Sequence, residues 1–153
     1  MNDITIRRAT SGDCQRLMEL IRGLADYEKM PGEVTVSTEH FRESGFGQNP
    51  VWWAFVAEAG GQINGFALYF IRYSTWKGCQ MYLEDIYVEP EMRGRGIGRM
   101  LFDRLIEEAK GRGLCAIKWQ ALTWNEPALN FYRKYYGAKF DNGWTDCSIT
   151  VTP

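Results

Sequence analysis

The chain has 153 residues, of which 45% are hydrophobic and 24% charged, and its net charge at pH 7 is -1. This length and composition predict a single globular domain, residues 1–153, that is long enough to bury a proper core. The near-neutral charge argues against a protein built to coat nucleic acid, which needs a strongly basic face.

The first half of the chain predicts a strand, two helices and then three strands. Alternation in Ile4–Ala9 predicts the first strand. Thr10 and Asp13 resemble a capping box, and apolar residues at helical spacing then predict a helix that ends near Glu28, before a Pro-Gly pair. A short helix at about 38–43 follows.

Three runs rich in β-forming residues come next and predict antiparallel strands at 51–58, 63–71 and 80–88. The first two are joined by the sequence AGGQ, which is a hairpin signal. From Ile97 to Lys110 an apolar stripe predicts a helix, and glycines follow it.

The last third predicts a strand at Cys115–Leu122 and a helix capped by Asn125 and closed by Gly137. Short strands at Ala138–Phe140 and Cys147–Val151 complete the prediction. The strand-helix-strand order implies a right-handed crossover, so the strands at 80–88 and 115–122 should be parallel neighbours. The predicted fold class is therefore α/β (α+β), with an antiparallel meander followed by a parallel strand pair.

Cysteine and histidine usage points away from a metal site. Cys14, Cys79, Cys115 and Cys147 form no CxxC pair, and His40 is the only histidine. Because zinc sites need clustered ligands, we expect no metal. Isolated cysteines are typical of buried thiols in a reducing cytosol.

The N-terminal sequence MNDITIRR has no apolar core of a signal peptide, and the apolar run Phe66–Ile71 is too short to span a bilayer. We therefore expect a cytoplasmic protein without a membrane anchor.

The sequence RGRGIG, from Arg93 to Gly98, lies where a strand is predicted to end and a helix to begin. Glycines allow a helix N-terminus to approach a phosphate closely, and arginines add charge, so phosphate or pyrophosphate is the expected ligand. The loop is neither a Walker loop, which needs Lys-Ser/Thr, nor a Rossmann fingerprint, which needs a third glycine where Arg99 stands. A glycine-rich turn with solvated arginines remains the alternative.

The longer sequence around this loop, VEPEMRGRGIGRML, resembles the R/Q-x-x-G-x-G/A loop of the GNAT N-acetyltransferase superfamily. The sequence WNEPALNFYRKYYGA resembles a later family segment, in which an asparagine precedes an aromatic-bearing helix. The resemblance covers nearly the whole chain and weakens after Ala138. It implies a mixed sheet flanked by about four helices, with the parallel strand pair splayed to admit coenzyme A.

Narrower matches, including LADYEKM, GFALYF, YLEDIYV and WNEPALNFY, are similar to the diamine (spermidine/spermine) acetyltransferases and the thialysine acetyltransferases. This resemblance implies acetyl-CoA as co-substrate, a primary amine of a small diamine, polyamine or lysine-like amino acid as acceptor, and a homodimer. It also implies which residues bind the coenzyme: Ile86, Tyr87, Val88, Arg93, Gly94, Arg95, Gly96, Ile97, Gly98, Arg99, Asn125, Glu126, Pro127 and Ala128. A bulge at Ile86–Val88 would let a backbone N–H stabilise the thioester oxygen.

Acetyl transfer to an amine requires a base, because an alkylamine with a pKa of about 10.4 is almost fully protonated at pH 7. Glu84 and Asp85 are adjacent in a strand, so strict alternation sends their side chains to opposite faces. The resemblance assigns Glu84 as acceptor ligand and general base, directly or through water, and Asp85 as a supporting group. It assigns Tyr132 as the general acid that protonates the departing thiolate, whereas the sequence alone leaves Tyr135 and Tyr136 as rivals.

Glu28, beside Tyr27, is predicted at a helix C-terminus, where the helix dipole disfavours an anion and a substrate ammonium group would compensate. Trp76 is a candidate for a cation–π contact with the acceptor. The resemblance adds three residues that flank the acceptor: Lys118, Trp119 and Gln120.

The predicted reaction is a direct attack of the amine on the thioester in a ternary complex, without an acetyl-cysteine. Two alternatives stay open at this stage. One is a non-catalytic acyl-CoA-binding sensor with the same fold. The other is an acetyltransferase whose acceptor is an amine of a protein or peptide.

Overall fold

The computed structural model describes residues 3–152, and its internal contacts divide the chain into two compact units with their boundary between Gln120 and Ala121. The first unit contains the sheet and the three helices α1 to α3, and the second contains α4 and the C-terminal segment.

The strands of the described residues form one sheet in the order β1 (Ile4–Arg8), β2 (Trp53–Ala59), β3 (Gln62–Ser74), β4 (Gly78–Val88) and β5 (Ile117–Lys118). Neighbours from β1 to β4 are antiparallel, whereas β4 and β5 are parallel. The mixed sheet predicted from the sequence is thereby confirmed.

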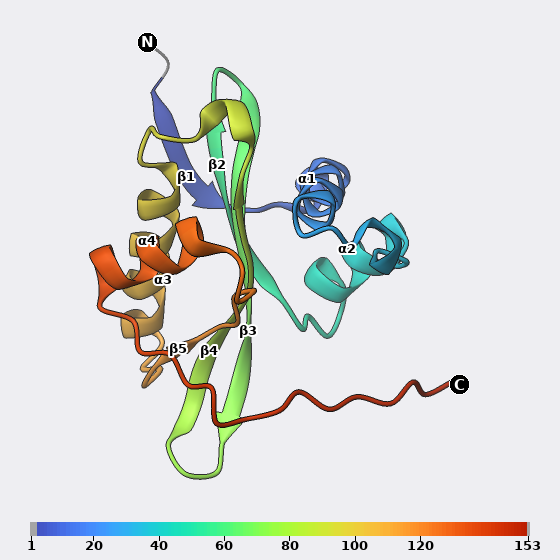
Figure 1. The fold of residues 1–153 in the computed structure, drawn as a ribbon. Coiled ribbons are helices and arrows are strands. Elements are labelled where there is room, and N and C mark those ends of the chain that lie inside the picture. The colour runs from blue at the N-terminus through green and yellow to red at the C-terminus, as the bar shows by residue number, and fades with distance from the viewer. Residues whose placement is uncertain (1–2, 153) are drawn as a thin grey trace. The chain divides into compact units, whose positions relative to one another are not determined.

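Helices cover both faces of this sheet (Figure 1). On one face lie α1 (Cys14–Tyr27) and α2 (Thr38–Phe46), and on the other lies α3 (Ile97–Gly111). The α1 face carries a continuous buried cluster that includes Leu17, Phe66 and Leu68. Gly60 and Gly61, the predicted hairpin glycines, both have a positive φ, which residues with a Cβ rarely adopt. They therefore allow the tight turn between β2 and β3.

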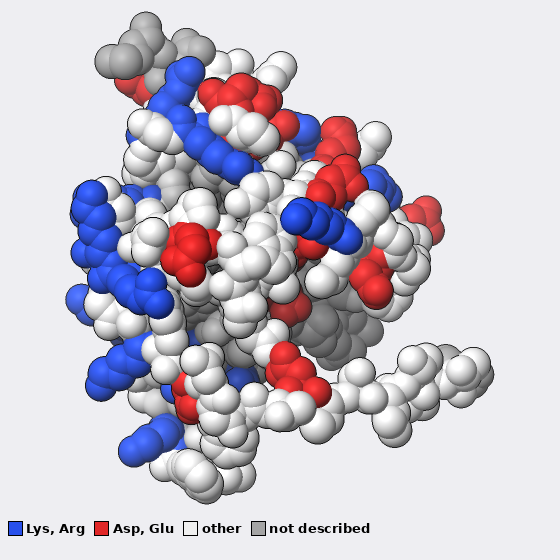
Figure 2. Space-filling view, in the orientation of Figure 1, with Lys and Arg blue, Asp and Glu red and all other residues white. Residues whose placement is uncertain are grey.

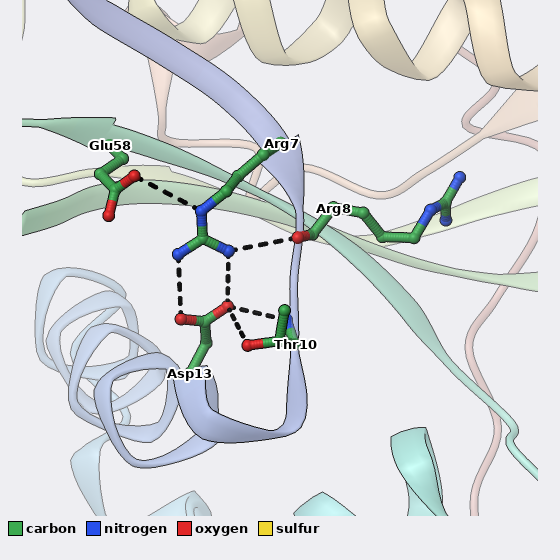
Figure 3. A network of polar contacts seen from close by, with 5 residues as sticks. All are labelled: Arg7, Arg8, Thr10, Asp13 and Glu58. Atoms are coloured by element: carbon green, nitrogen blue, oxygen red, sulfur yellow. Dashed lines mark hydrogen bonds and ion pairs between the residues drawn. The ribbon is translucent and has the colours of Figure 1, made fainter.

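Arg7 of β1 ties the sheet to the start of α1 (Figure 3). Its guanidinium donates two hydrogen bonds to Asp13, at 2.8 and 3.1 Å, and one to Glu58 of β2, at 3.4 Å. The Asp13 carboxylate also accepts from the backbone N–H of Thr10 at 2.7 Å, so the predicted capping contact is present. The next side chain, Arg8, points to the other side of β1 because successive strand residues alternate.

A second charged network, centred on Glu108 of α3, holds that helix against the opposite face. One carboxylate oxygen of Glu108 accepts from Arg8, Arg112 and the Tyr69 hydroxyl, each at 2.8 Å. Burial opposes ionisation of Glu108, but these hydrogen bonds outweigh it and lower the pKa to about 2. The ionised carboxylate therefore links β1, β3 and the end of α3.

The predicted helix in the second unit is confirmed as α4 (Glu126–Tyr136), with the Asn125 side chain accepting from the N–H of Ala128 and Gly137 in the left-handed conformation. The predicted strands at Ala138–Phe140 and Cys147–Val151 are wrong, because no strand forms in that described segment. Alternating β-forming residues make a strand only where a neighbouring edge accepts their hydrogen bonds. The strand predicted at Cys115–Leu122 also shrinks to the two residues of β5 for this reason.

Among the described residues, no helix is both long and apolar enough to cross a membrane. Figure 2 shows that acidic and basic side chains share the face in view, in keeping with the net charge of -1.

We predict that Glu108→Gln lowers stability at pH 7 by up to about 3 kcal/mol, because a folded-state pKa near 2 stabilises the ionised protein above the unfolded pKa. This contribution disappears as pH falls through about 2. Chemical denaturation from pH 3 to pH 8 should therefore give a difference between variant and wild type that shrinks toward acid. The exposed neighbour Glu107 provides the control Glu107→Gln, and a difference independent of pH would contradict the prediction.

Candidate active site

The ladder between β3 and β4 is interrupted at Glu84. Leu68 pairs with Asp85 and the next residue, Tyr69, pairs with Leu83, so Glu84 is the extra residue of a β-bulge. The bulge resets the alternation along β4: Asp85 opposes Leu68, which belongs to the cluster under α1. Leu83 and Asp85 therefore lie on opposite faces although they are two residues apart, and the orientation of Glu84 relative to Asp85 stays a prediction.

Three carboxylates meet near this bulge. Burial, followed by the charges of Glu84 and Glu28, raises the pKa of Asp85 to about 7. Burial also raises the pKa of Glu28. Among residues 3–152, none of the three forms an ion pair within 4 Å. The site thus concentrates negative charge without a protein cation bound to it.

Glu28 stands where the sequence placed it, at the C-terminal cap of α1. The helix dipole adds negative potential there, on top of the two β4 carboxylates. The following residue, Lys29, has a φ of 63° and is the one described non-glycine residue with positive φ. A residue in this conformation ends the helix and fixes where the Glu28 side chain starts.

The glycine loop joins the end of β4 to α3. Gly94 and Gly96 have φ values of 80° and 81°, and a Cβ built at either position would meet no atom within 4 Å. Gly96 is the N-cap of α3, so the N–H groups of the first helical turn point toward the loop without helical acceptors. This open backbone with a positive helix end fits a phosphate group.

Three hydrogen bonds that the sequence did not reveal hold the loop in place. Arg16 of α1 donates to Glu89, the residue after β4, at 2.6 Å, and to the carbonyl of Ile63 at 3.0 Å. Arg93 donates to the carbonyl of Val88 at 2.9 Å. The sequence signals these hydrogen bonds only by the presence of arginine and glutamate residues. Their positions do not predict the pairing, because each arginine binds either a residue remote along the chain or a backbone carbonyl.

The Arg93 guanidinium lies over two aromatic rings, at 4.9 Å from the ring centre of Tyr27 and 5.6 Å from that of Tyr87. Tyr27 precedes Glu28, and Arg93 begins the glycine loop. One side chain therefore connects the end of α1 with the candidate phosphate-binding loop through cation–π contacts.

The edge of β4 that faces β5 is paired only at Met81 and Tyr82. From Leu83 to Val88, no described strand pairs with that edge, so the two parallel strands separate before the glycine loop. The bulge at Ile86–Val88, predicted as the condition for a backbone oxyanion donor there, is absent, because that stretch pairs regularly with β3. The irregularity lies at Glu84 instead.

Among the other predicted acceptor residues of the first unit, Trp76 lies away from the carboxylates along β4. Trp76 is at the β3–β4 turn and is 82% exposed. A strand advances about 3.4 Å per residue, so the span from Gly78 to Glu84 is about 20 Å. Trp119 packs edge-on against Phe102 of α3, on the face opposite α1. The acceptor contacts of Trp76 and Trp119, and those of Lys118 and Gln120, stay predictions.

In the second unit, Tyr132 is buried, with 7% of its surface exposed, whereas Tyr135 is 41% exposed. Asn125 and Pro127 shape the first turn of α4, next to Glu126 and Ala128. The roles of Tyr132 as general acid and of residues 125–128 beside the coenzyme stay predictions.

Of the four thiols, Cys14 is buried as expected, but Cys79, Cys115 and Cys147 are exposed, so the expectation of buried thiols is wrong for these three. Cys79 lies at the start of β4, Cys115 just before β5, and Cys147 in the C-terminal segment. Among the described residues, no group of three or more His, Cys, Asp or Glu side chains is placed to hold a metal ion.

Comparison with known proteins matches residues 15–138 to the acetyltransferase (GNAT) family. A thialysine N-epsilon-acetyltransferase of Bos taurus is 41% identical over 138 residues, which cover 85% of this chain and 81% of that protein. The spermidine/spermine N(1)-acetyltransferase-like protein 1 of Homo sapiens is 31% identical over 94% of this chain and 22% of its own length. A solved aminoglycoside N-acetyltransferase, AAC(6')-Iy in complex with CoA, shares the fold with a TM-score of 0.73 at 18% identity, covering 100% of this chain and 95% of its own.

We predict that Asp85→Asn stabilises the protein more at pH 8 than at pH 5. A folded-state pKa near 7, against about 3.9 in the unfolded chain, means that the wild type loses stability as pH rises between these values, by about 2–4 kcal/mol. Denaturation of wild type and variant at both pH values measures the difference. The same measurement on Glu107→Gln controls for general charge effects, and an equal gain at pH 5 and pH 8 would contradict the origin of the effect.

Proposed function

Since the chain belongs to the GNAT acetyltransferase family, we propose that it transfers the acetyl group of acetyl-CoA to a primary amine of a small diamine, polyamine or lysine-like amino acid. The observation that carries the acceptor class is the cluster formed by Glu28, Glu84 and Asp85. Three crowded carboxylates without a protein cation favour a ligand that carries more than one positive charge.

The coenzyme has a matching place in the first unit. The N–H groups of residues 94–98 and the helix end of α3 bind its diphosphate, and the side chains of Arg95 and Arg99 add positive charge. The separated edge of β4 at Ile86, Tyr87 and Val88 offers backbone groups to the amides of its pantetheine arm, as an added strand would. Bound acetyl-CoA supplies an activated acetyl group as a thioester.

The carboxylates perform two tasks in this proposal. Glu28 and Asp85 hold the ammonium groups of the acceptor, and Glu84 takes the proton from the amine that attacks the thioester. Binding of a cation beside Asp85 lowers its pKa from about 7, so binding of a diamine at neutral pH releases a proton from the protein. The carboxylates thus bind the acceptor in its charged form and then favour its conversion to the nucleophile.

The leaving thiolate needs a proton, and Tyr132 donates it from its hydroxyl. A phenol pKa of about 10 and a thiol pKa of about 8.5 are close enough for efficient transfer. The amine attacks directly in a complex that holds both substrates, so the C–N bond forms as the C–S bond breaks. Orientation of the two substrates lowers the barrier further.

The names of the relatives support this acceptor class. Thialysine is the acceptor named for the bovine relative, and spermidine and spermine are named for the human one. We also propose that the protein is a cytoplasmic homodimer. Tyr73 and Trp76, 71% and 82% exposed at the β3–β4 turn, provide apolar surface of the kind that protein interfaces cover.

A thiol-release assay with acetyl-CoA tests the proposal directly, using putrescine, spermidine, spermine, lysine and thialysine as acceptors. We expect turnover with at least one of these amines and acetylation of its primary amine in the isolated product. Coenzyme binding without turnover of any amine would favour an acyl-CoA-binding sensor, and turnover of peptide amines alone would favour a protein acetyltransferase; both results contradict the proposal.

Replacing Tyr132 by phenylalanine should lower kcat by about 10²–10⁴-fold, because the ring stays and only the proton donor is lost. The Kd for CoA, measured by calorimetry, should change by less than about twofold. Tyr135→Phe is the matched control on the same helix, and it should retain wild-type turnover. If Tyr132→Phe turns over as fast as the wild type, another group is the general acid.

Glu28→Gln should raise the KM for diamines by about tenfold, which corresponds to the loss of one ion pair with the distal ammonium group. Monoamines of the same chain length lack that group, and their KM should change by less than about twofold. Steady-state kinetics with matched acceptors, such as putrescine and butylamine, separates the two effects. An equal rise for both would remove the proposed contact between Glu28 and the distal charge.

A further inference from the structure

Two exposed thiols lie side by side where β4 and the segment before β5 begin to run parallel. The strand register pairs Met81 with Ile117. Two residues earlier on each segment stand Cys79, within β4, and Cys115, just before β5. Both are exposed, and both belong to the first unit.

Hydrogen bonds fix the two cysteines as neighbours. The backbone N–H of Cys115 donates to the carbonyl oxygen of Cys79 at 3.2 Å. The Cys115 thiol lies 3.3 Å from the carbonyl oxygen of Lys77 and 3.5 Å from that of Cys79. The backbone hydrogen bond between the two residues is compatible with the Cα separation of about 4.4–6.8 Å that a disulfide spans.

From this geometry we propose that Cys79 and Cys115 form a reversible redox site, at which a peroxide oxidises the two thiols to an intramolecular disulfide. One thiolate attacks hydrogen peroxide to give a sulfenic acid and hydroxide, and the second thiol then displaces water as the S–S bond forms. The net reaction converts two thiols and one peroxide into a disulfide and two waters. Exposure gives peroxide and thiol reductants access to the same sulfur atoms.

The other cysteines do not offer this arrangement. Cys14 is 0% exposed, in the cluster under α1, so neither an oxidant nor a second thiol reaches it without unfolding. Cys147 is exposed but belongs to the second unit. Its thiol lies 3.6 Å from the carbonyl oxygen of Thr145.

The disulfide would reinforce the weakest part of the sheet. The parallel ladder between β4 and β5 has two residue pairs among the described residues. The disulfide would join the two segments of the chain immediately before these pairs. The closed ring contains the carboxylates of β4, the glycine loop and α3. Cross-linking therefore restricts local opening of β5, which a short and partly exposed ladder otherwise permits.

The test treats the full-length protein with hydrogen peroxide under denaturant-free conditions and maps disulfides by mass spectrometry before and after reduction. We expect a monomer that has lost two hydrogen atoms, with one linked peptide pair containing residues 79 and 115. Cys79→Ser and Cys115→Ser should each abolish this linkage, whereas Cys147→Ser should retain it. Dithiothreitol should restore the reduced mass.

Hydrogen exchange provides a second readout on the oxidised wild type. Protection of the Ile117 and Lys118 amides should rise by about tenfold on oxidation, and Cys79→Ser should show no such rise. Oxidation that stops at sulfenic or sulfinic acid on either residue, linkage to Cys147, or linkage only between two copies would overturn the proposal.

Discussion

The extra residue in β4 at Glu84 is the constraint on which the candidate active site depends. An uninterrupted strand would direct Asp85 toward α3, into an apolar layer that includes Leu101 and Leu105. The bulge instead aligns Asp85 with Leu68, on the side of α1. Two adjacent carboxylates and the end of a helix then share one region, where burial and, after it, the charges of Glu84 and Glu28 raise the pKa of Asp85.

The proposed coenzyme side and acceptor side of the site depend on different physical interactions. In the proposed function, the coenzyme side depends on the backbone, because glycines with positive φ and the start of α3 present N–H groups in a fixed pattern. The proposed acceptor side depends on side-chain charge, and burial of Asp85 there raises its pKa. Such a division suits a family in which one coenzyme is combined with many acceptors, because the acceptor side can vary while the loop stays.

Local patterns predicted most of the fold. The apolar stripe of α3, the Asn125 cap and the hairpin glycines each act within a few residues, and all three are present. The errors occurred where the outcome depends on distant partners. The segment after Ala138 has a strand-like sequence but forms no strand among the described residues, and the length of β5 depends on how far it stays near β4.

The same division applies to the site. The glycine loop and the position of Glu28 at a helix end followed from sequence spacing and turn signals. The bulge at Glu84 did not, because a bulge is a property of the pairing between two strands and leaves no residue signature here. The sequence also did not predict that Arg16 anchors the loop, because its partner Glu89 is 73 positions from Arg16 along the chain.

The stacking of Arg93 on Tyr27 has a consequence for redesign of this enzyme. If Glu28 binds the acceptor as proposed, Tyr27 beside it is a first choice for variation. Its ring, however, also contacts Arg93, which begins the glycine loop. Under the proposed function, a change at Tyr27 would therefore affect coenzyme binding as well, so libraries that vary position 27 should vary position 93 at the same time.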